Sequence, residues 1–168
     1  EIGIQSALTG HLVFSTLHTN DAVGGITRLL DMGVEAYLIS SSVGAFIAQR
    51  LVRRLCPDCK QQRRVSVQNL KELGFPAQQD TVVYEAQGCK HCGFTGYRGR
   101  EAIFEFLIMD EQIRGLVAQK ASASRIKEAA VQAGMTSLVQ DGWNKVRQGV
   151  TTAGEIVRVT REDAGSAV

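Results

Sequence analysis

The sequence predicts an α/β fold that carries an inserted tetracysteine module and ends in a helical subdomain. A short, apolar, β-prone run at residues 12–15 suits a buried strand. Two Cys-x-x-Cys pairs stand in the middle of the chain, and helix-capping residues recur after residue 110. With 168 residues and 44% hydrophobic content, the chain can bury the core of one domain with an added module.

Residues 1–55 are expected to form an α/β segment. After the strand, Asn20 or Asp21 can cap a helix that ends before a glycine. Its apolar stripe comprises Val23, Ile26, Leu29 and Leu30. A second helix is expected over residues 35–50, where small side chains allow close packing against a neighbour.

Residues 56–95 contain all four cysteines, as Cys56 with Cys59 and Cys89 with Cys92. Each pair is a short chelating hook, and two hooks around one Zn²⁺ give four thiolates in tetrahedral geometry with no open position. Such a metal holds a fold together and performs no chemistry, so the pattern indicates a structural zinc site. A disulfide pair and a redox dithiol remain alternatives.

The module and the residues after it offer further local signals. Between the hooks, Ser66 can cap a short helix, and residues 81–84 are typical of a strand. Residues 96–109 are expected to return to the main domain through a strand that starts at Ala102.

Residues 110–168 are expected to be helical. Four residues stand at N-cap positions: Asp110, Ser122, Thr136 and Thr152. Glu155 completes a Thr-x-x-Glu capping box after the last of them. The expected packed face comprises Leu138, Val139, Trp143 and Val146.

The charge pattern limits the function classes. A formal net charge of +2 is too small to require a nucleic-acid partner, and no aromatic residue stands between Phe46 and Phe75 to stack bases beside the basic stretch at residues 50–64. Within that stretch, Arg50, Arg53 and Arg54 are expected to meet an acidic partner surface or anionic lipid, with an ordinary solvated face as the alternative. No apolar run approaches the roughly 20 residues that span a bilayer, and no leader precedes the first strand, so we expect the C-terminal part of a longer soluble protein.

The polar end of the first expected strand is the candidate for chemistry. Residues 9–22 read Thr-Gly-His-Leu-Val-Phe-Ser-Thr-Leu-His-Thr-Asn-Asp-Ala, with histidines at His11 and His18. Hydrogen-bonding side chains at the carboxyl edge of a buried strand lie where open α/β sheets bind ligands. The alternative is that these side chains only cap the following helix and that both histidines are surface groups.

This segment resembles the histidine box of the secretion ATPases that drive type II secretion and type IV pilus assembly, a branch of the RecA-like P-loop superfamily. The resemblance covers nearly the whole chain. It extends to the cysteine order and to residues 28–33, 48–57, 96–100 and 141–160.

The resemblance implies that residues 1–55 are the C-terminal part of a RecA-like core and that residues 96–109 return to it. It implies a cytoplasmic homo-hexamer that uses ATP and Mg²⁺ and associates peripherally with the inner membrane through platform proteins. In that reading His18 lies near the γ-phosphate, and His11 positions the catalytic strand. Arg98 and Arg100 approach the adenine side of the nucleotide.

The cysteine spacing favours a type II secretion ATPase, with a type IV pilus assembly ATPase as the alternative. A zinc-braced interaction module is the alternative from another class. No Gly-x-x-x-x-Gly-Lys-Ser/Thr loop occurs in these residues, so we expect the chain alone not to hydrolyse ATP.

Overall fold

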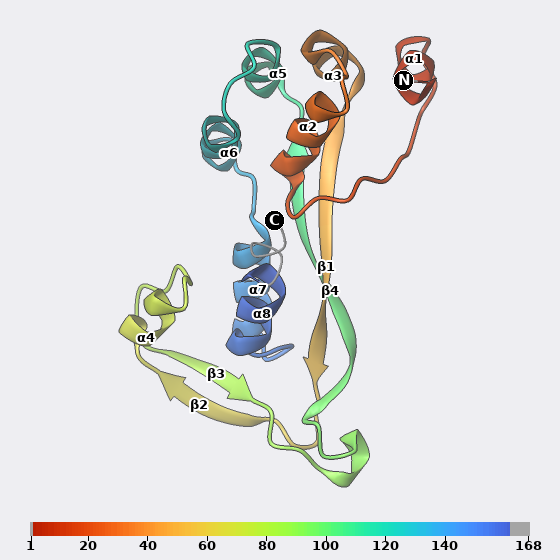
Figure 1. Cartoon of the computed structure of the whole chain (residues 1–168). Helices are drawn as coiled ribbons and strands as arrows, with labels where there is room; N and C mark the ends of the chain where they lie inside the picture. The colour runs from red at the N-terminus through yellow and green to blue at the C-terminus, as the bar shows by residue number, and fades with distance from the viewer. Residues whose placement is uncertain (1, 162–168) are drawn as a thin grey trace. The chain divides into compact units, whose positions relative to one another are not determined.

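A computed structural model describes residues 2–161 as a mixed α/β structure with two small sheets, which confirms the predicted fold class (Figure 1). The chain divides into two compact units. The first contains Glu105–Ser137 and the residues up to Ala48, and the second contains Gln49–Phe104 and the residues from Leu138 onward. Two long strands, β1 (Ala45–Leu55) and β4 (Tyr97–Ile108), pair with each other and contribute residues to both units.

The first unit is mainly helical. Its helices are α1 (Ile2–Leu8), α2 (Ala22–Asp31), α3 (Ala36–Ser42), α5 (Glu111–Ala118) and α6 (Ala123–Gln132). Asp21 caps α2 as predicted, because its Oδ1 accepts a hydrogen bond from the Gly24 N–H at 2.8 Å. Val23 and Ile26 of the predicted stripe are buried in the core of this unit.

The predicted strand at residues 12–15 is wrong. These residues run without regular secondary structure between α1 and α2, and the side chains of Leu12 and Phe14 are 84% and 87% exposed. A buried strand needs hydrogen-bonded neighbours and a covering layer. Within residues 2–161 no strand pairs with this segment, so its apolar composition is not matched by burial.

The predicted helix over residues 35–50 is correct only in its first half. Helix α3 ends at Ser42, and Val43 already has extended backbone angles. From Ala45 the chain follows β1, where Phe46 and Ile47 suit a pleated strand better than a helix. Pairing with β4 therefore overrides the small-residue pattern that favoured a longer helix.

The second unit holds both hooks. Besides its share of β1 and β4, it contains β2 (Gln61–Val65), α4 (Val67–Glu72), β3 (Thr81–Glu85), the 3-10 helix η1 (Lys90–Cys92), α7 (Leu138–Arg147) and α8 (Ala153–Arg161). Strands β2 and β3 are antiparallel, with Arg63 opposite Val83. Strand β3 was predicted, whereas β2 was not, and β4 begins five residues before the predicted Ala102.

Local capping signals were mostly predicted correctly. Ser66, Asp110 and Ser122 each accept a hydrogen bond from the backbone three residues later. Helix α7 begins at Leu138, so the residue before it is Ser137 and not the predicted Thr136.

The last helix begins as predicted, with Thr152 Oγ1 accepting the Glu155 N–H at 3.2 Å. Leu138, Trp143 and Val146 form the buried face expected for α7, and the Trp143 ring stacks on Phe75 with centroids 5.1 Å apart. Within the described residues, no helix has both the length and the apolar character needed to cross a membrane.

Candidate metal centre and its surroundings

Two turns bring the four cysteines together in the second unit. Cys56 and Cys59 follow directly after β1, while Cys89 and Cys92 enclose η1. The hooks are joined to the β4 side by a hydrogen bond from the Cys56 N–H to the Gly96 carbonyl at 2.9 Å. The strands β1 and β4 therefore set the position of both hooks.

The sulfur geometry fits a tetrahedral metal site. All four Sγ atoms lie within 4.8 Å of one another, and Cys56–Cys89, Cys59–Cys92 and Cys89–Cys92 are 3.9, 3.9 and 3.8 Å apart. Four sulfurs at the zinc–thiolate distance of about 2.3 Å have tetrahedral edges of about 3.8 Å. All four cysteines are free thiols, because these Sγ–Sγ distances are nearly twice the disulfide bond length of about 2.05 Å. The set can hold one metal ion.

Backbone donors prepare Cys92 to carry negative charge. Burial opposes its thiolate, but the N–H groups of Cys89 and Gly96, each 3.2 Å from Cys92 Sγ, and the neighbouring thiols outweigh burial and lower the pKa of Cys92 to about 6. Burial and the surrounding thiols raise the pKa of Cys59 to about 12. A cation among the sulfurs would favour the thiolate form of every ligand, since metal binding displaces the thiol protons.

A polar contact links the two hooks outside the sulfur cluster. His91 Nδ1, on the second hook, lies 3.0 Å from Asp58 Oδ2, on the first hook. Both side chains are exposed, so the contact adds little stability on its own.

The histidine segment, residues 9–22, lies in the first unit. His11 is exposed, and its Nδ1 is 3.0 Å from Thr9 Oγ1. His18 is exposed just before α2. The buried Glu105 carboxylate fixes the start of that helix by accepting the Ala22 N–H at 2.9 Å.

A second contact holds the same helix start. Lys127 Nζ on α6 donates to Asp21 Oδ2 at 2.8 Å. Burial alone would lower the pKa of Lys127, but the Asp21 carboxylate raises it above its ordinary value. The end of the histidine segment is thus fixed, although Leu12 and Phe14 earlier in the segment are exposed.

The other predicted site residues are dispersed. Arg98 and Arg100 lie on β4 in the second unit and are exposed. Among the predicted site residues within the described chain, only the cysteines meet in one cluster.

Sequence reasoning missed an ion-pair network at Glu155. Its carboxylate, whose side chain is 0% exposed, accepts hydrogen bonds from Arg53 Nε at 3.0 Å and Nη2 at 2.7 Å, and from Arg158 Nη2 at 2.7 Å. Of the predicted capping box, the structure shows the Thr152 half, while the Glu155 carboxylate binds Arg53 and Arg158. Arg53 also lies over the Tyr97 ring, 4.2 Å from its centroid, so it is engaged within the chain and is not a free docking group.

The charges in this network stabilise one another. Burial opposes ionisation of Glu155, but the hydrogen bonds from Arg158 and Arg53 lower its pKa to about 2. The hydrogen bond to Glu155 raises the pKa of Arg53. No local sequence pattern pairs Arg53 with Glu155, because 102 residues separate them.

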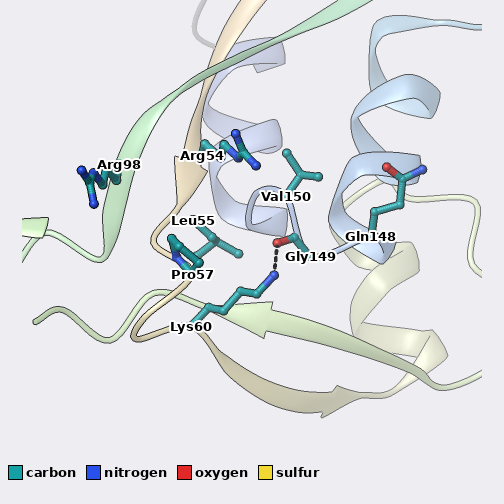
Figure 2. A pocket seen from close by; sticks show the side chains of 8 residues that line it. All are labelled: Arg54, Leu55, Pro57, Lys60, Arg98, Gln148, Gly149 and Val150. Atoms are coloured by element: carbon teal, nitrogen blue, oxygen red, sulfur yellow. Dashed lines mark hydrogen bonds between the residues drawn. The ribbon is translucent and has the colours of Figure 1, made fainter. Parts of the chain in front are cut away.

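The second unit also contains a basic hollow of about 430 Å³ that the sequence does not predict (Figure 2). It is lined by Arg54, Leu55, Pro57, Lys60, Arg98, Gln148, Gly149 and Val150. Three of these residues are cationic and none is acidic. The sequence places them in three separate segments, so no spacing motif could reveal the hollow.

Known proteins resemble this chain over nearly its whole length. A sequence model of the family described as Type II/IV secretion system protein matches residues 1–158. The Type II secretion system ATPase E of Vibrio cholerae is 46% identical over 162 residues, which is 96% of this chain and 32% of that protein. The Type IV pilus assembly ATPase PilB of Myxococcus xanthus is also 46% identical, over 97% of this chain and 29% of that protein. The chain spans about a third of the length of these curated relatives.

Proposed function

Because this chain belongs to the Type II/IV secretion system protein family, we propose that it is the C-terminal part of an ATPase that powers type II protein secretion. The observation that carries the proposal is 46% identity to a type II secretion ATPase over 96% of the chain. In the longer protein, the chain would complete a RecA-like ATPase core that binds ATP with Mg²⁺. The phosphate loop would come from other residues, since this chain holds no such motif.

In this proposal the histidine segment faces the phosphates. His18 would stabilise charge that develops at the γ-phosphate, and His11 would hold the segment in position. The hydrogen bonds that Glu105 and Lys127 make at the start of α2 support the idea, because they fix Asp21 and Ala22, which lie three and four residues after His18. Arg98 and Arg100 would contact the nucleotide from β4.

We further propose that Cys56, Cys59, Cys89 and Cys92 hold one structural Zn²⁺. Sulfur separations of 3.8 to 3.9 Å support a tetrahedral ion, and four thiolates leave no position for substrate. The ion would supply binding energy to a module that is too small to build a sufficient core of its own.

The assembly and location follow the same proposal. The longer protein would act as a cytoplasmic homo-hexamer, attached peripherally to the inner membrane through platform proteins, with no nucleic-acid partner. A type IV pilus assembly ATPase remains the second candidate, supported by 46% identity to PilB of Myxococcus xanthus.

A chimera experiment separates the two candidates. The corresponding third of the Vibrio cholerae secretion ATPase and of the Myxococcus xanthus pilus ATPase would each be replaced by this chain, and secretion or pilus formation measured. We expect secretion to be restored more fully than pilus formation. ATP hydrolysis by both chimeras would be measured in parallel. A hydrolytically active secretion chimera that fails to secrete, beside an active pilus chimera that forms pili, would reverse the assignment.

A further inference from the structure

The basic hollow combines one anchored and two exposed cations. Lys60 follows the first hook, Arg54 lies on β1 and Arg98 lies on β4 (Figure 2). The floor includes the turn between α7 and α8, which supplies Gln148, Gly149 and Val150. A volume of about 430 Å³ lies in the range of natural small-ligand sites.

Lys60 is fixed in place while keeping free donors. Its Nζ donates to the Gly149 carbonyl at 2.9 Å and lies 4.7 Å from the centroid of the Tyr84 ring. An ammonium group has three N–H donors, so one hydrogen bond to a carbonyl leaves donors available for a ligand. The ring and the carbonyl orient the charge without neutralising it.

The cations of the hollow lack counter-charges. Within residues 2–161, no carboxylate pairs with Arg54, Lys60 or Arg98. Two other arginines of the same unit are paired, Arg53 with Glu155 and Arg63 with Glu85. Placing three like charges around one concavity is unfavourable unless an anion neutralises them.

We propose that the basic hollow binds a phosphate-type oxyanion carrying two or more negative charges. The Arg54 guanidinium offers forked donors that match phosphate oxygens, and Lys60 adds a point charge at the floor. The Arg98 side chain points away from both and adds positive charge at the edge of the hollow (Figure 2). The apolar part of the lining consists of Leu55, Pro57 and Val150, which gives no hydrogen-bonding pattern for reading a larger ligand. Arg54 and Lys60 line the hollow and Arg100 does not, so the hollow shares only Arg98 with the nucleotide contacts proposed from β4.

Titration of the 168-residue chain with inorganic pyrophosphate, followed by calorimetry, tests the proposal without requiring ATP hydrolysis. We expect saturable binding that Arg54→Gln weakens about tenfold, because it removes one charge-assisted contact, and that Arg98→Gln weakens less, because it removes a charge at the edge of the hollow. Arg64→Gln is the matched control, since Arg64 is exposed on β2 outside the hollow and its replacement changes the net charge equally. Arg100→Gln should also leave pyrophosphate binding unchanged.

A second measurement identifies the source of the oxyanion. Flotation with phosphatidic acid vesicles, whose phosphomonoester headgroup can carry two negative charges, against neutral phosphatidylcholine vesicles, reports whether a lipid headgroup occupies the hollow. Binding of either probe that depends on Arg54 and Arg98 supports the oxyanion site. The proposal is overturned if neither probe binds, or if Arg64→Gln or Arg100→Gln weakens binding as much as Arg54→Gln does. Either negative result leaves the proposed ATPase function standing, because hydrolysis by the longer protein is measured separately.

Discussion

Arg53 binds Glu155 through both its backbone and its side chain, across 102 residues of sequence. The Arg53 N–H donates to Glu155 Oε1 at 3.0 Å, while the guanidinium donates twice to Oε2. The Thr151 hydroxyl donates to the Arg53 carbonyl at 2.8 Å, so both backbone groups of one β1 residue are held by α8 and the turn before it. One buried carboxylate thus joins the end of β1 to the last helix.

We expect Glu155→Gln to destabilise the chain by about 2–3 kcal/mol, because it removes a buried charge that accepts hydrogen bonds from Arg53 and Arg158. Urea unfolding followed by circular dichroism measures the change. Glu128→Gln, on the exposed side of α6, is the control and should change the free energy of unfolding by less than about 0.5 kcal/mol. Equal effects of the two substitutions would contradict the structural role of Glu155.

The same carboxylate predicts a loss of stability in acid. The pKa of Glu155 is about 2 in the folded chain and 4.5 ordinarily, so its contribution is fully present above pH 4.5 and is lost as the pH falls towards 2. At about 1.4 kcal/mol per pKa unit, the contribution reaches at most about 3 kcal/mol. The difference in unfolding free energy between the wild type and Glu155→Gln should therefore shrink through this window. A constant difference would exclude Glu155 as the titrating group.

A glycine pair tests how tightly the hooks are built. Gly96 and Gly99 both have positive φ, at 77° and 80°, but a Cβ at Gly96 would lie 2.5 Å from the Cβ of Ala86, whereas a Cβ at Gly99 meets nothing within 4 Å. Gly99→Ala should cost about 1 kcal/mol of unfolding free energy from backbone strain. Gly96→Ala should cost about 1–3 kcal/mol more from crowding.

Metal affinity gives that comparison a second readout. The Gly96 N–H donates to Cys92 Sγ and its carbonyl accepts the Cys56 N–H, so Gly96→Ala should also weaken metal retention against a chelator. Gly99→Ala should not. Equal retention by both variants would show that Gly96 does not support the sulfur cluster.

Elemental analysis should find one Zn²⁺ per chain under reducing conditions. Cys92→Ser should lose the metal, because the alcohol is a far poorer ligand than the thiolate that two N–H groups stabilise. Hydrogen exchange should then accelerate in residues 56–95 and remain unchanged in α2. A metal ratio near zero in the wild type would remove the zinc assignment.

In the longer ATPase, His18→Ala should lower kcat at least tenfold while KM for ATP changes less than about twofold, because the proposed contact forms at the transition state. Steady-state kinetics with MgATP measure both constants. Lys71→Ala, on the exposed surface of α4, is the control. If kcat of the His18 variant stays within about twofold of the wild type, the histidine has only a structural role.

Features that depend on neighbouring residues were predictable from the sequence. The caps at Ser66, Asp110 and Ser122 each involve a backbone group three residues away, and the two hooks are visible in their own spacing. Such signals are complete within one turn of chain. These local signals therefore do not depend on the arrangement of the rest of the fold.

Features that depend on distant partners were not predictable. Residues 12–15 have a strand-like composition, but a strand also requires partners, which composition cannot report. Residues 45–50 form a strand because β4 pairs with them, more than 40 positions later. The sequence predicts an external acidic surface for Arg53, because no local pattern reveals its internal partner, Glu155, which lies 102 residues away.

The hydrogen bond from Lys60 to Gly149 spans 89 residues, which gives the second unit a fixed order of completion during synthesis. All four cysteines have been translated by residue 92, so the metal centre can close on the nascent chain before the turn between α7 and α8 exists. At a translation rate of about 5–20 residues per second, roughly 5–20 s pass between the synthesis of Lys60 and that of its acceptor, Gly149. Early metal loading would keep the hooks ordered during that interval.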